Sequence, residues 1–282
     1  GYMNKEILII CRGGGDLATG IVHRLFRAGY QVLILETAEP AAIRRQVSFC
    51  EAVYEGTATV EGVTAERIYT AKKQAVEEVL QRGRIPLLVD PDGRSIEVLK
   101  PDVVVDAIIA KKNLGTYKEM APLVIGIGPG FVAGEDVHLV VESMRGHNLA
   151  RILETGSALA NTGIPGNIGG YTKERVIHAA AEGYMKNLHQ IGDVVQKGEE
   201  IARIYEQMSP DGVFSGRFVS VEATIPGVLR GLIREGYHFQ KGFKIADIDP
   251  RESELANCFT ISDKASSIGG SVLEAVCRYV NG

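Results

Sequence analysis

Three glycines, Gly13, Gly14 and Gly15, follow the apolar run "EILII" in the stretch "CRGGGDLATG". Gly13, Gly15 and Ala18 match the spacing G-x-G-x-x-A, in which the first glycine makes a tight turn and the second lets a diphosphate approach the backbone. Backbone N–H groups at the start of the following helix then face the anion. Asp16 either caps this helix or contacts the ligand. The spacing predicts a nucleotide-binding loop, and a glycine-rich turn without a ligand is the alternative.

An acidic residue stands where a nucleotide-binding loop of this kind needs one. Glu36 ends the second apolar run, "YQVLILE", 21 residues after Gly15. A carboxylate at this place would accept hydrogen bonds from a ribose diol and disfavour a 2′-phosphate. We therefore expect Glu36 to bind the ribose of the nucleotide.

A β-α-β unit is needed to position these residues. The run "EILII" is typical of a buried strand, and the segment "GIVHRLFRAG" places apolar residues along one helical face before Gly29 ends the helix. A second buried strand follows. The pattern predicts an α/β fold with an N-terminal Rossmann-like parallel sheet.

Further candidate residues lie in and just after the apolar run "VVVDAII", which contains Asp106 and is followed by "AKKN". The carboxyl ends of strands in an open α/β sheet form the ligand crevice. We therefore expect Asp106 and Lys111 to line the site, together with Lys112 and Asn113. A solvated Lys-Lys turn is the alternative.

A second glycine-rich stretch, "LVIGIGPGF", supplies Gly128 and Gly130, and "ESMRGHNL" supplies Arg145 and His147. A guanidinium group can hold an anion through a fork of N–H groups that lysine does not have. We expect these residues and the loop "NTGIPG" to line one wall of the same cleft as the first glycine loop. The alternative is that the glycines only turn the chain and Arg145 pairs with a surface carboxylate, which contributes at most about 1 kcal/mol.

The C-terminal half contains an internal repeat. Aligning Ile177–Ile204 with Val221–Ile248 at an offset of 44 gives ten identities in 28 positions, with Gly192 opposite Gly236. Short runs between glycine turns predict two related β units about a pseudo-twofold axis. The pattern "GDVVQKGEEIARI" resembles the half-motif of biotinyl and lipoyl carrier domains, which form a barrel-sandwich hybrid. Because the connection Tyr205–Ser220 holds no lysine for a covalent group, we expect a rigid interaction or gating module.

Length and composition exclude several classes of partner. The 282 residues carry a net charge of -4, which gives no reason to expect a nucleic-acid or anionic-membrane partner. Neither a membrane span nor a secretion signal is evident. The four cysteines lie far apart, without metal-ligand or redox spacing. The sequence predicts a cytoplasmic protein without a metal site, and it does not predict the oligomeric state.

The length also suggests more than one domain. We expect four segments: a Rossmann-like cofactor-binding domain over residues 1–115, a glycine-rich middle region that completes the cleft over 116–172, the duplicated β module over 173–250, and a C-terminal tail and helix over 251–282.

Several blocks along the chain resemble the selenium-dependent molybdenum hydroxylase accessory family: "RGGGDLATGIVHRL", "RRQVSFCEAVYEG", "VVVDAIIAKKN", "GIGPGFVAGEDVHLVVESMRGHNL" and "TISDKASSIGGSVLEAV". The glycine-loop half is more remotely similar to the Rossmann domain of xanthine dehydrogenase accessory proteins. The resemblance implies a protein that matures a selenium-dependent molybdenum hydroxylase, with that client enzyme as its partner. It leaves open whether the chain catalyses a step.

Two ligands fit the expected loop, because molybdopterin dinucleotide and NAD both contain a diphosphate. The first hypothesis is a maturation factor that binds either one. The second is an NAD-dependent oxidoreductase with Lys111 or His138 as an acid-base group. The third is a non-catalytic scaffold that docks on a client enzyme. Cys11, just before the loop, is either a relay for sulfur or selenium or a buried strand residue.

Overall fold

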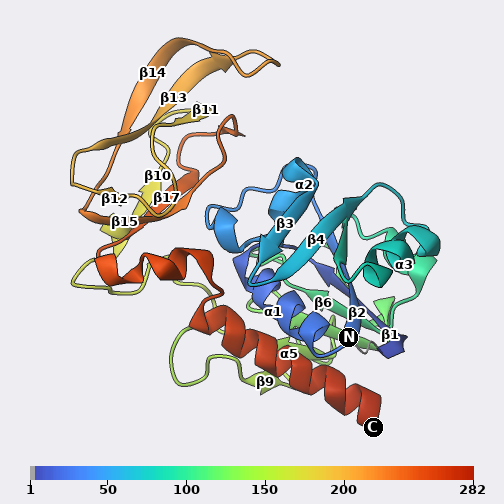
Figure 1. Cartoon of the computed structure of the whole chain (residues 1–282). Helices are drawn as coiled ribbons and strands as arrows, with labels where there is room; N and C mark the ends of the chain where they lie inside the picture. Colours follow the sequence, from blue (N-terminus) through green and yellow to red (C-terminus); the bar gives the residue numbers. More distant parts are fainter. Residues whose placement is uncertain (1–3) are drawn as a thin grey trace. The chain divides into compact units, whose positions relative to one another are not determined.

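The chain divides into two compact units, drawn in Figure 1 from a computed structural model that describes residues 4–282. The sheet unit comprises the chain up to Pro40, Val47–Thr162 and Ile261–Gly282. The repeat unit comprises Ala41–Gln46 and Gly163–Thr260, and it contains the internal repeat. The four segments expected from the sequence stay a prediction.

The sheet unit is built on a nine-stranded sheet in the order β3-β4-β5-β2-β1-β6-β7-β8-β9. Neighbouring strands from β4 to β8 run parallel, and β3 and β9 pair antiparallel at the two ends. The general α/β fold is therefore confirmed. The strands are β1 (Asn4–Arg12), β2 (Tyr30–Glu36), β3 (Thr57–Val60), β4 (Val63–Ile68), β5 (Ile85–Val89), β6 (Val103–Asp106), β7 (Leu123–Ile127), β8 (Leu139–Val141) and β9 (Ile152–Leu153).

The strand order reverses at β1, because the chain first adds strands on one side of β1 and then on the other. It passes through β2 to β5 on one side of β1 and later through β6, β7 and β8 on the other. Arg12 at the end of β1 is in register with Leu35 near the end of β2 and with Asp106 at the end of β6. These strands therefore end along one edge, which we call the carboxyl edge. Ligand crevices in open α/β sheets form at such a reversal.

Helices and 3-10 turns connect the strands. The α-helices are α1 (Asp16–Arg27), α2 (Ala52–Glu55), α3 (Lys73–Gln81), α4 (Ser95–Leu99) and α5 (Asp263–Asn281), and the 3-10 turns are η1 (Arg45–Val47), η2 (Phe49–Glu51), η3 (Lys118–Met120), η4 (Lys173–Arg175), η5 (Glu252–Glu254) and η6 (Ala256–Phe259).

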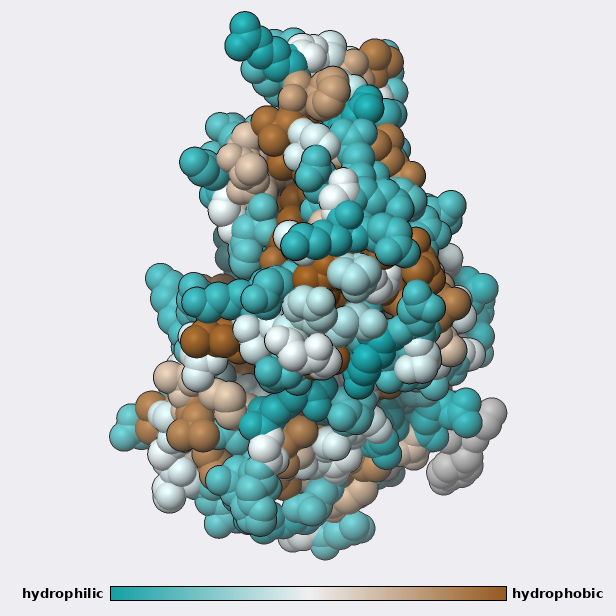
Figure 2. All heavy atoms as spheres, turned by 90° about the vertical axis from the view of Figure 1, so that its left-hand side faces the viewer, coloured by the Kyte–Doolittle hydropathy of each residue, from teal (hydrophilic) through white to brown (hydrophobic). Residues whose placement is uncertain are grey.

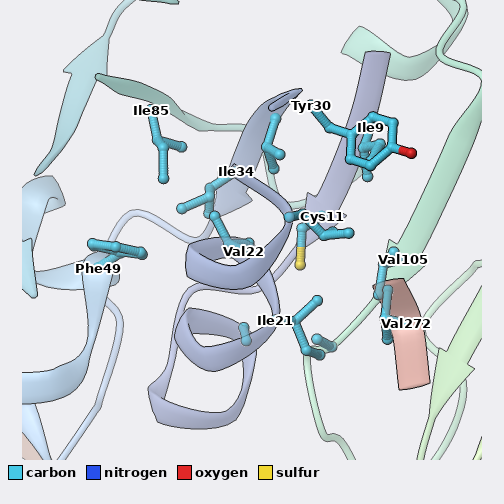
Figure 3. Packing of buried hydrophobic residues seen from close by; sticks show 14 of the residues in the cluster. Ile9, Cys11, Ile21, Val22, Tyr30, Ile34, Phe49, Ile85, Val105 and Val272 are labelled. Atoms are coloured by element: carbon cyan, nitrogen blue, oxygen red, sulfur yellow. The ribbon is translucent and has the colours of Figure 1, made fainter. Parts of the chain in front are cut away.

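Both faces of the sheet are buried, because successive side chains of a strand point to opposite sides. Ile9 and Cys11 lie on the face covered by α1 and α5, and Figure 3 shows Val22 of α1 and Val272 of α5 in the same cluster. Ile10 lies in the cluster on the opposite face, with side chains of α3 and α4. Burial on both faces explains why the parallel strands appear in the sequence as continuous apolar runs.

Helices α1 and α5 lie side by side (Figure 1), and glycines make their close contact possible. A Cβ atom on Gly20 would lie 2.6 Å from the Cβ of Ala265, and one on Gly269 would lie 2.7 Å from the Gly20 carbonyl oxygen. The Tyr30 hydroxyl, at the start of β2, lies 3.6 Å from the sulfur of Cys277 near the end of α5. Both helices therefore start at the carboxyl edge and run away from it.

The repeat unit consists of two four-stranded sheets, β10-β17-β15-β12 and β14-β13-β11-β16. Each strand of the first repeat has a counterpart 44 residues later, because β11, β12 and β13 correspond to β15, β16 and β17, and β10 corresponds to the end of β14. The two central strands of each sheet come from one repeat and the two outer strands from the other. The strands are β10 (Val176–His178), β11 (Gly183–Asn187), β12 (Val194–Val195), β13 (Glu200–Met208), β14 (Phe214–Glu222), β15 (Gly227–Leu232), β16 (His238–Phe239) and β17 (Lys244–Asp249).

Equivalent glycines of the two repeats have equivalent backbones. Gly192 and Gly236 have φ angles of 99° and 84°. A Cβ atom on Gly183 would collide with the carbonyl oxygen of Tyr205, and one on Gly227 would collide with that of Asp249, 44 residues after Tyr205. The sequence repeat is thus also a repeat of backbone conformation.

No helix within residues 4–282 is long and apolar enough to cross a membrane. On the face drawn in Figure 2, hydrophobic residues lie in small groups among hydrophilic ones. The cytoplasmic location and the absence of nucleic-acid and membrane partners stay predictions.

Candidate functional site

The first glycine loop lies at the carboxyl edge, between the ends of β2 and β6. The Gly13 N–H donates to the Leu35 carbonyl at 2.8 Å. Gly13 has a φ of +102°, and a Cβ atom there would lie 2.7 Å from the carbonyl oxygen of Ala107. Only glycine adopts this conformation without strain, so Gly13 is needed for the turn.

The backbone is open at Gly15, the residue before α1. A Cβ atom on Gly15 would meet nothing within 4 Å. Gly15 is the N-cap of α1 and, as a glycine, has no side chain with which to cap this helix. Asp16 is the first helical residue and not the N-cap, so of its two alternatives the capping role is not the one observed. Ala18 lies one turn further on, 1% exposed in the core, where its small side chain suits close packing of α1 on the sheet.

Glu36, at the end of β2, is joined to the glycine loop. Its carboxylate accepts hydrogen bonds from the N–H of Gly14 at 2.8 Å and from the N–H of Thr37 at 2.7 Å. Burial raises the pKa of Glu36, and the two N–H donors oppose this increase. The Gly14 carbonyl in turn accepts from the N–H of Cys50 at 2.9 Å. Both the N–H and the carbonyl of Gly14 are therefore hydrogen-bonded within the protein. The N–H groups that could face a ligand are those that follow Gly14 in the chain.

Asp106 takes part in a buried polar network at the ends of β1 and β6. The Thr116 hydroxyl donates to Asp106 at 2.6 Å and accepts from the Arg12 guanidinium at 2.8 Å. Arg12 also donates to the carbonyl of Pro91 at 3.0 Å. Burial raises the pKa of Asp106, and the Thr116 hydroxyl and the charge of Arg12 oppose this increase. The sequence analysis missed Arg12 and Thr116, although a charged residue at the end of an apolar strand was a visible signal.

The loop 107–113, after β6, separates the two glycine-rich stretches. A Cβ atom on Gly13 would contact Ala107, and one on Gly130 would contact the backbone of Lys112 at 3.2 Å. The Asn113 side chain accepts from the N–H of Thr116 at 2.8 Å and closes the loop. Lys111 and Lys112 are exposed at its tip. Both glycine-rich stretches thus adjoin the same loop from opposite ends.

The second glycine-rich stretch follows β7. Gly128 has a φ of +79°, and its N–H donates to the Val141 carbonyl at 2.9 Å. A Cβ atom on Gly128 would lie 2.8 Å from the hydroxyl of Ser143. Gly130, with a φ of +104°, turns the chain toward Phe131. These glycines turn the backbone in close contact with neighbouring segments.

Arg145 pairs with a carboxylate of α5. Its guanidinium donates to both oxygens of Asp263, at 3.1 and 2.8 Å, and lowers the pKa of Asp263 to about 2. Both side chains are largely exposed, at 56% and 77%. The expected alternative, a surface pair, therefore describes Arg145 in this structure. His147 is exposed on the same segment.

Lys264, next to Asp263 on α5, is a cation that the sequence analysis missed. It is half-buried, and burial followed by the charge of Arg145 lowers its pKa. The carboxylates of Asp16 and Glu142 act on its pKa in the opposite direction. Lys264 therefore belongs to the electrostatic surroundings of the α1 start.

Other sequence candidates lie elsewhere or lack the expected chemistry. His138 precedes β8, at the edge opposite the glycine loop, and its Nδ1 accepts from the N–H of Val124 at 2.8 Å. Cys11 is 0% exposed, and burial raises the pKa of its thiol, which disfavours the thiolate that a relay needs. The loop "NTGIPG" is divided between the two units. Among residues 4–282, no group of three or more His, Cys, Asp or Glu residues could hold a metal ion.

Comparison with known proteins gives one close relative. No protein-family model matches the chain. The chain is 46% identical over 274 residues to the uncharacterized protein YqeB of Escherichia coli, and the match covers 97% of this chain and 48% of YqeB. The chain thus spans about half the length of the curated relative it matches.

Similar solved structures are much more distant. An aspartoacylase family protein from Mesorhizobium loti has a TM-score of 0.30 at 11% identity, with 89% of this chain and 87% of that chain covered. A succinylglutamate desuccinylase from Silicibacter has a TM-score of 0.27 at 12% identity, with 88% and 85% covered. The ectoine utilization protein EutE from Ruegeria pomeroyi, in a product-bound structure, has a TM-score of 0.25 at 10% identity, with 80% and 61% covered. Similarities this weak carry no inference about the chemistry of this chain.

These comparisons correct the expected family. None of the proteins found by the comparisons is described as a molybdenum hydroxylase accessory protein. The similar structures are described as succinylglutamate desuccinylase or aspartoacylase proteins, and the relative as an uncharacterized protein. The expected resemblance to the selenium-dependent molybdenum hydroxylase and xanthine dehydrogenase accessory families is therefore wrong. The maturation role is withdrawn with it, and the alternative of an NAD-dependent oxidoreductase has no support either.

Proposed function

We propose that this chain is a nucleotide-binding protein that holds the diphosphate of its ligand at Gly15 and the start of α1. The observation that carries the proposal is the open space at Gly15, the glycine N-cap of α1. Unpaired N–H groups and the helix dipole favour an anion there. Because Glu36 already occupies the Gly14 N–H, the phosphate oxygens would bind the N–H groups that follow it.

Glu36 would bind the ribose of this nucleotide. Each of its carboxylate oxygens accepts one backbone N–H and keeps a further lone pair for a hydroxyl group. A half-buried negative charge at this point would also disfavour a 2′-phosphate.

The strand order supports a Rossmann-like description of the sheet unit. The order β5-β2-β1-β6-β7-β8 corresponds to the 3-2-1-4-5-6 order of dinucleotide-binding sheets, with the glycine loop at the reversal. The exchange of strands between the two sheets of the repeat unit likewise supports a barrel-sandwich-hybrid-like module.

NAD and molybdopterin dinucleotide remain the two proposed cofactors, because each contains a bridging diphosphate. The open backbone at Gly15 supports binding of this shared group. A docking partner of the chain, expected from the sequence as a client enzyme, likewise stays a prediction.

Isothermal titration with NAD, ADP and inorganic pyrophosphate tests the proposal. We expect Gly15→Ala to weaken binding of each bound probe at least tenfold, since the added Cβ occupies the open space where the diphosphate approaches. Gly270→Ala on α5 is the matched control, because a Cβ there also meets nothing within 4 Å. A probe at 100 times its dissociation constant should stabilise the wild-type fold by about 2.7 kcal/mol. Unchanged affinity in Gly15→Ala would remove the loop from the binding site.

A further inference from the structure

Ile109 adopts a backbone conformation that suits its residue type poorly. Its φ is +58°, in the left-handed region. A β-branched side chain in this region is a genuine outlier, whereas glycine or asparagine would be accommodated easily. The residue is 41% exposed, so the hydrophobic core gives no reason for an isoleucine here.

The surrounding contacts hold Ile109 in this conformation. The N–H of the preceding Ile108 donates to the Asp106 carboxylate at 3.1 Å, and Asp106 is itself fixed by Thr116. A Cβ atom on Gly13 would lie 3.0 Å from the Cα of Ile108. The residue before Ile109 is thus in direct contact with the glycine loop, and the strain is imposed by a rigid frame.

The other non-glycine residues with positive φ in the described part of the chain differ from Ile109. They are Glu61, Lys100 and Ala150, and none is β-branched. Lys100 has a local structural reason, because it is the C-cap of α4 and its N–H donates to the Ile96 carbonyl at 2.9 Å. Strained residues of this kind cluster at ligand-binding sites.

We infer that Ile109 is a ligand contact: its exposed aliphatic side chain packs against the aromatic base of the nucleotide held at the glycine loop. The inference rests on the proposed nucleotide site and adds a residue that distinguishes a nucleotide from a bare diphosphate. Ile109 combines an exposed apolar residue with an unfavourable backbone conformation, next to a residue that contacts the glycine loop.

Comparing ADP with inorganic pyrophosphate isolates the base from the diphosphate. We expect Ile109→Gly to weaken ADP binding at least fivefold and to leave pyrophosphate binding unchanged. Ile109→Val, which keeps the branched apolar side chain, should bind ADP within about twofold of wild type. Ile109→Gly should also raise Tm, because glycine relieves the left-handed strain. Lys100→Gly is the control, since it relieves a positive φ away from the carboxyl edge and should change neither affinity.

The outcomes separate this inference from the proposed function. If Ile109→Gly weakens ADP and pyrophosphate binding equally, or does not weaken ADP binding at all, the role of Ile109 is overturned. The nucleotide site is upheld independently if the probes bind wild type and bind Gly15→Ala more weakly. A lower Tm in Ile109→Gly overturns the strain on which the inference depends. If neither probe binds wild type, the proposed function fails and the inference fails with it.

Discussion

The Glu36 carboxylate accepts a hydrogen bond from the Gly14 N–H at 2.8 Å, which joins the end of β2 to the loop that follows β1. This hydrogen bond makes the Glu36 carboxylate one of the groups that fix the conformation of the glycine loop. A change at Glu36 therefore affects both the conformation of the loop and the charge beside it.

Glu36→Gln should reduce the pH dependence of stability. Burial raises the pKa of Glu36, so the folded protein holds the carboxyl proton more tightly than the unfolded chain does. The charged form costs stability above the raised pKa, and this cost is relieved as the pH falls toward the ordinary value of 4.5. We expect wild type to gain stability relative to Glu36→Gln as the pH is lowered through this range.

Urea denaturation of both proteins at several pH values between about 4.5 and 8 measures this difference. The raised pKa of Asp106 contributes equally to the pH dependence of stability in both proteins, so this contribution cancels when the two curves are compared. Lost hydrogen bonds in the variant shift its curve by an amount that is constant with pH. Parallel stability curves would contradict the prediction.

Gly13→Ala should destabilise the fold, unlike Gly15→Ala. At Gly13 the φ of +102° and the carbonyl of Ala107, 2.7 Å from the added Cβ, both oppose a side chain. We expect a loss of more than about 2 kcal/mol at Gly13 and less than about 1 kcal/mol at Gly15. The free energies of unfolding of the two variants test the difference, and equal losses would show that the loop can rearrange.

Gly20→Ala should disrupt the contact of α1 with α5. The new Cβ would lie 2.6 Å from the Cβ of Ala265 and 2.8 Å from its carbonyl oxygen, and such overpacking costs about 1–3 kcal/mol. Gly270→Ala is the control on α5, because a Cβ there is unobstructed and should add up to about 1 kcal/mol. Thermal unfolding distinguishes them, and a neutral Gly20→Ala would mean that the two helices separate easily.

Arg145→Ala should have a small effect that depends on pH and salt. The folded pKa of Asp263 is about 2, below its ordinary 3.8, so the stability from this pair is complete above about pH 4 and is lost as the pH falls toward 2. Because both side chains are exposed, we expect Arg145→Ala to cost less than about 1 kcal/mol at neutral pH. Repeating the measurement in 1 M salt should reduce the cost, and an unchanged cost would point to another contact of Arg145.

The α/β fold and the place of the glycine loop could be predicted because their signals are local. The tight turn at Gly13 and the small side chain at Ala18 follow from steric requirements within one β-α-β unit. The strand that ends at Glu36 follows in the same way from a short apolar run. Such features need no knowledge of distant residues.

The remaining parts of the site depend on contacts between distant residues. The Arg12 guanidinium meets Thr116, 104 residues away, and Arg145 meets Asp263, 118 residues away. No spacing in one sequence reports these pairs, because chain folding alone brings them together. The same holds for α5, whose contact with α1 through Gly20 and Ala265 spans nearly the whole chain.

The arrangement of the repeat unit has a consequence for how it could arise and fold. Because each sheet takes its central strands from one repeat and its outer strands from the other, a single repeat cannot complete a sheet. Two separate copies would have to exchange strands as a domain-swapped dimer. Joining the copies in one chain replaces that bimolecular encounter with an effective concentration on the order of millimolar, so assembly no longer depends on how much protein is present.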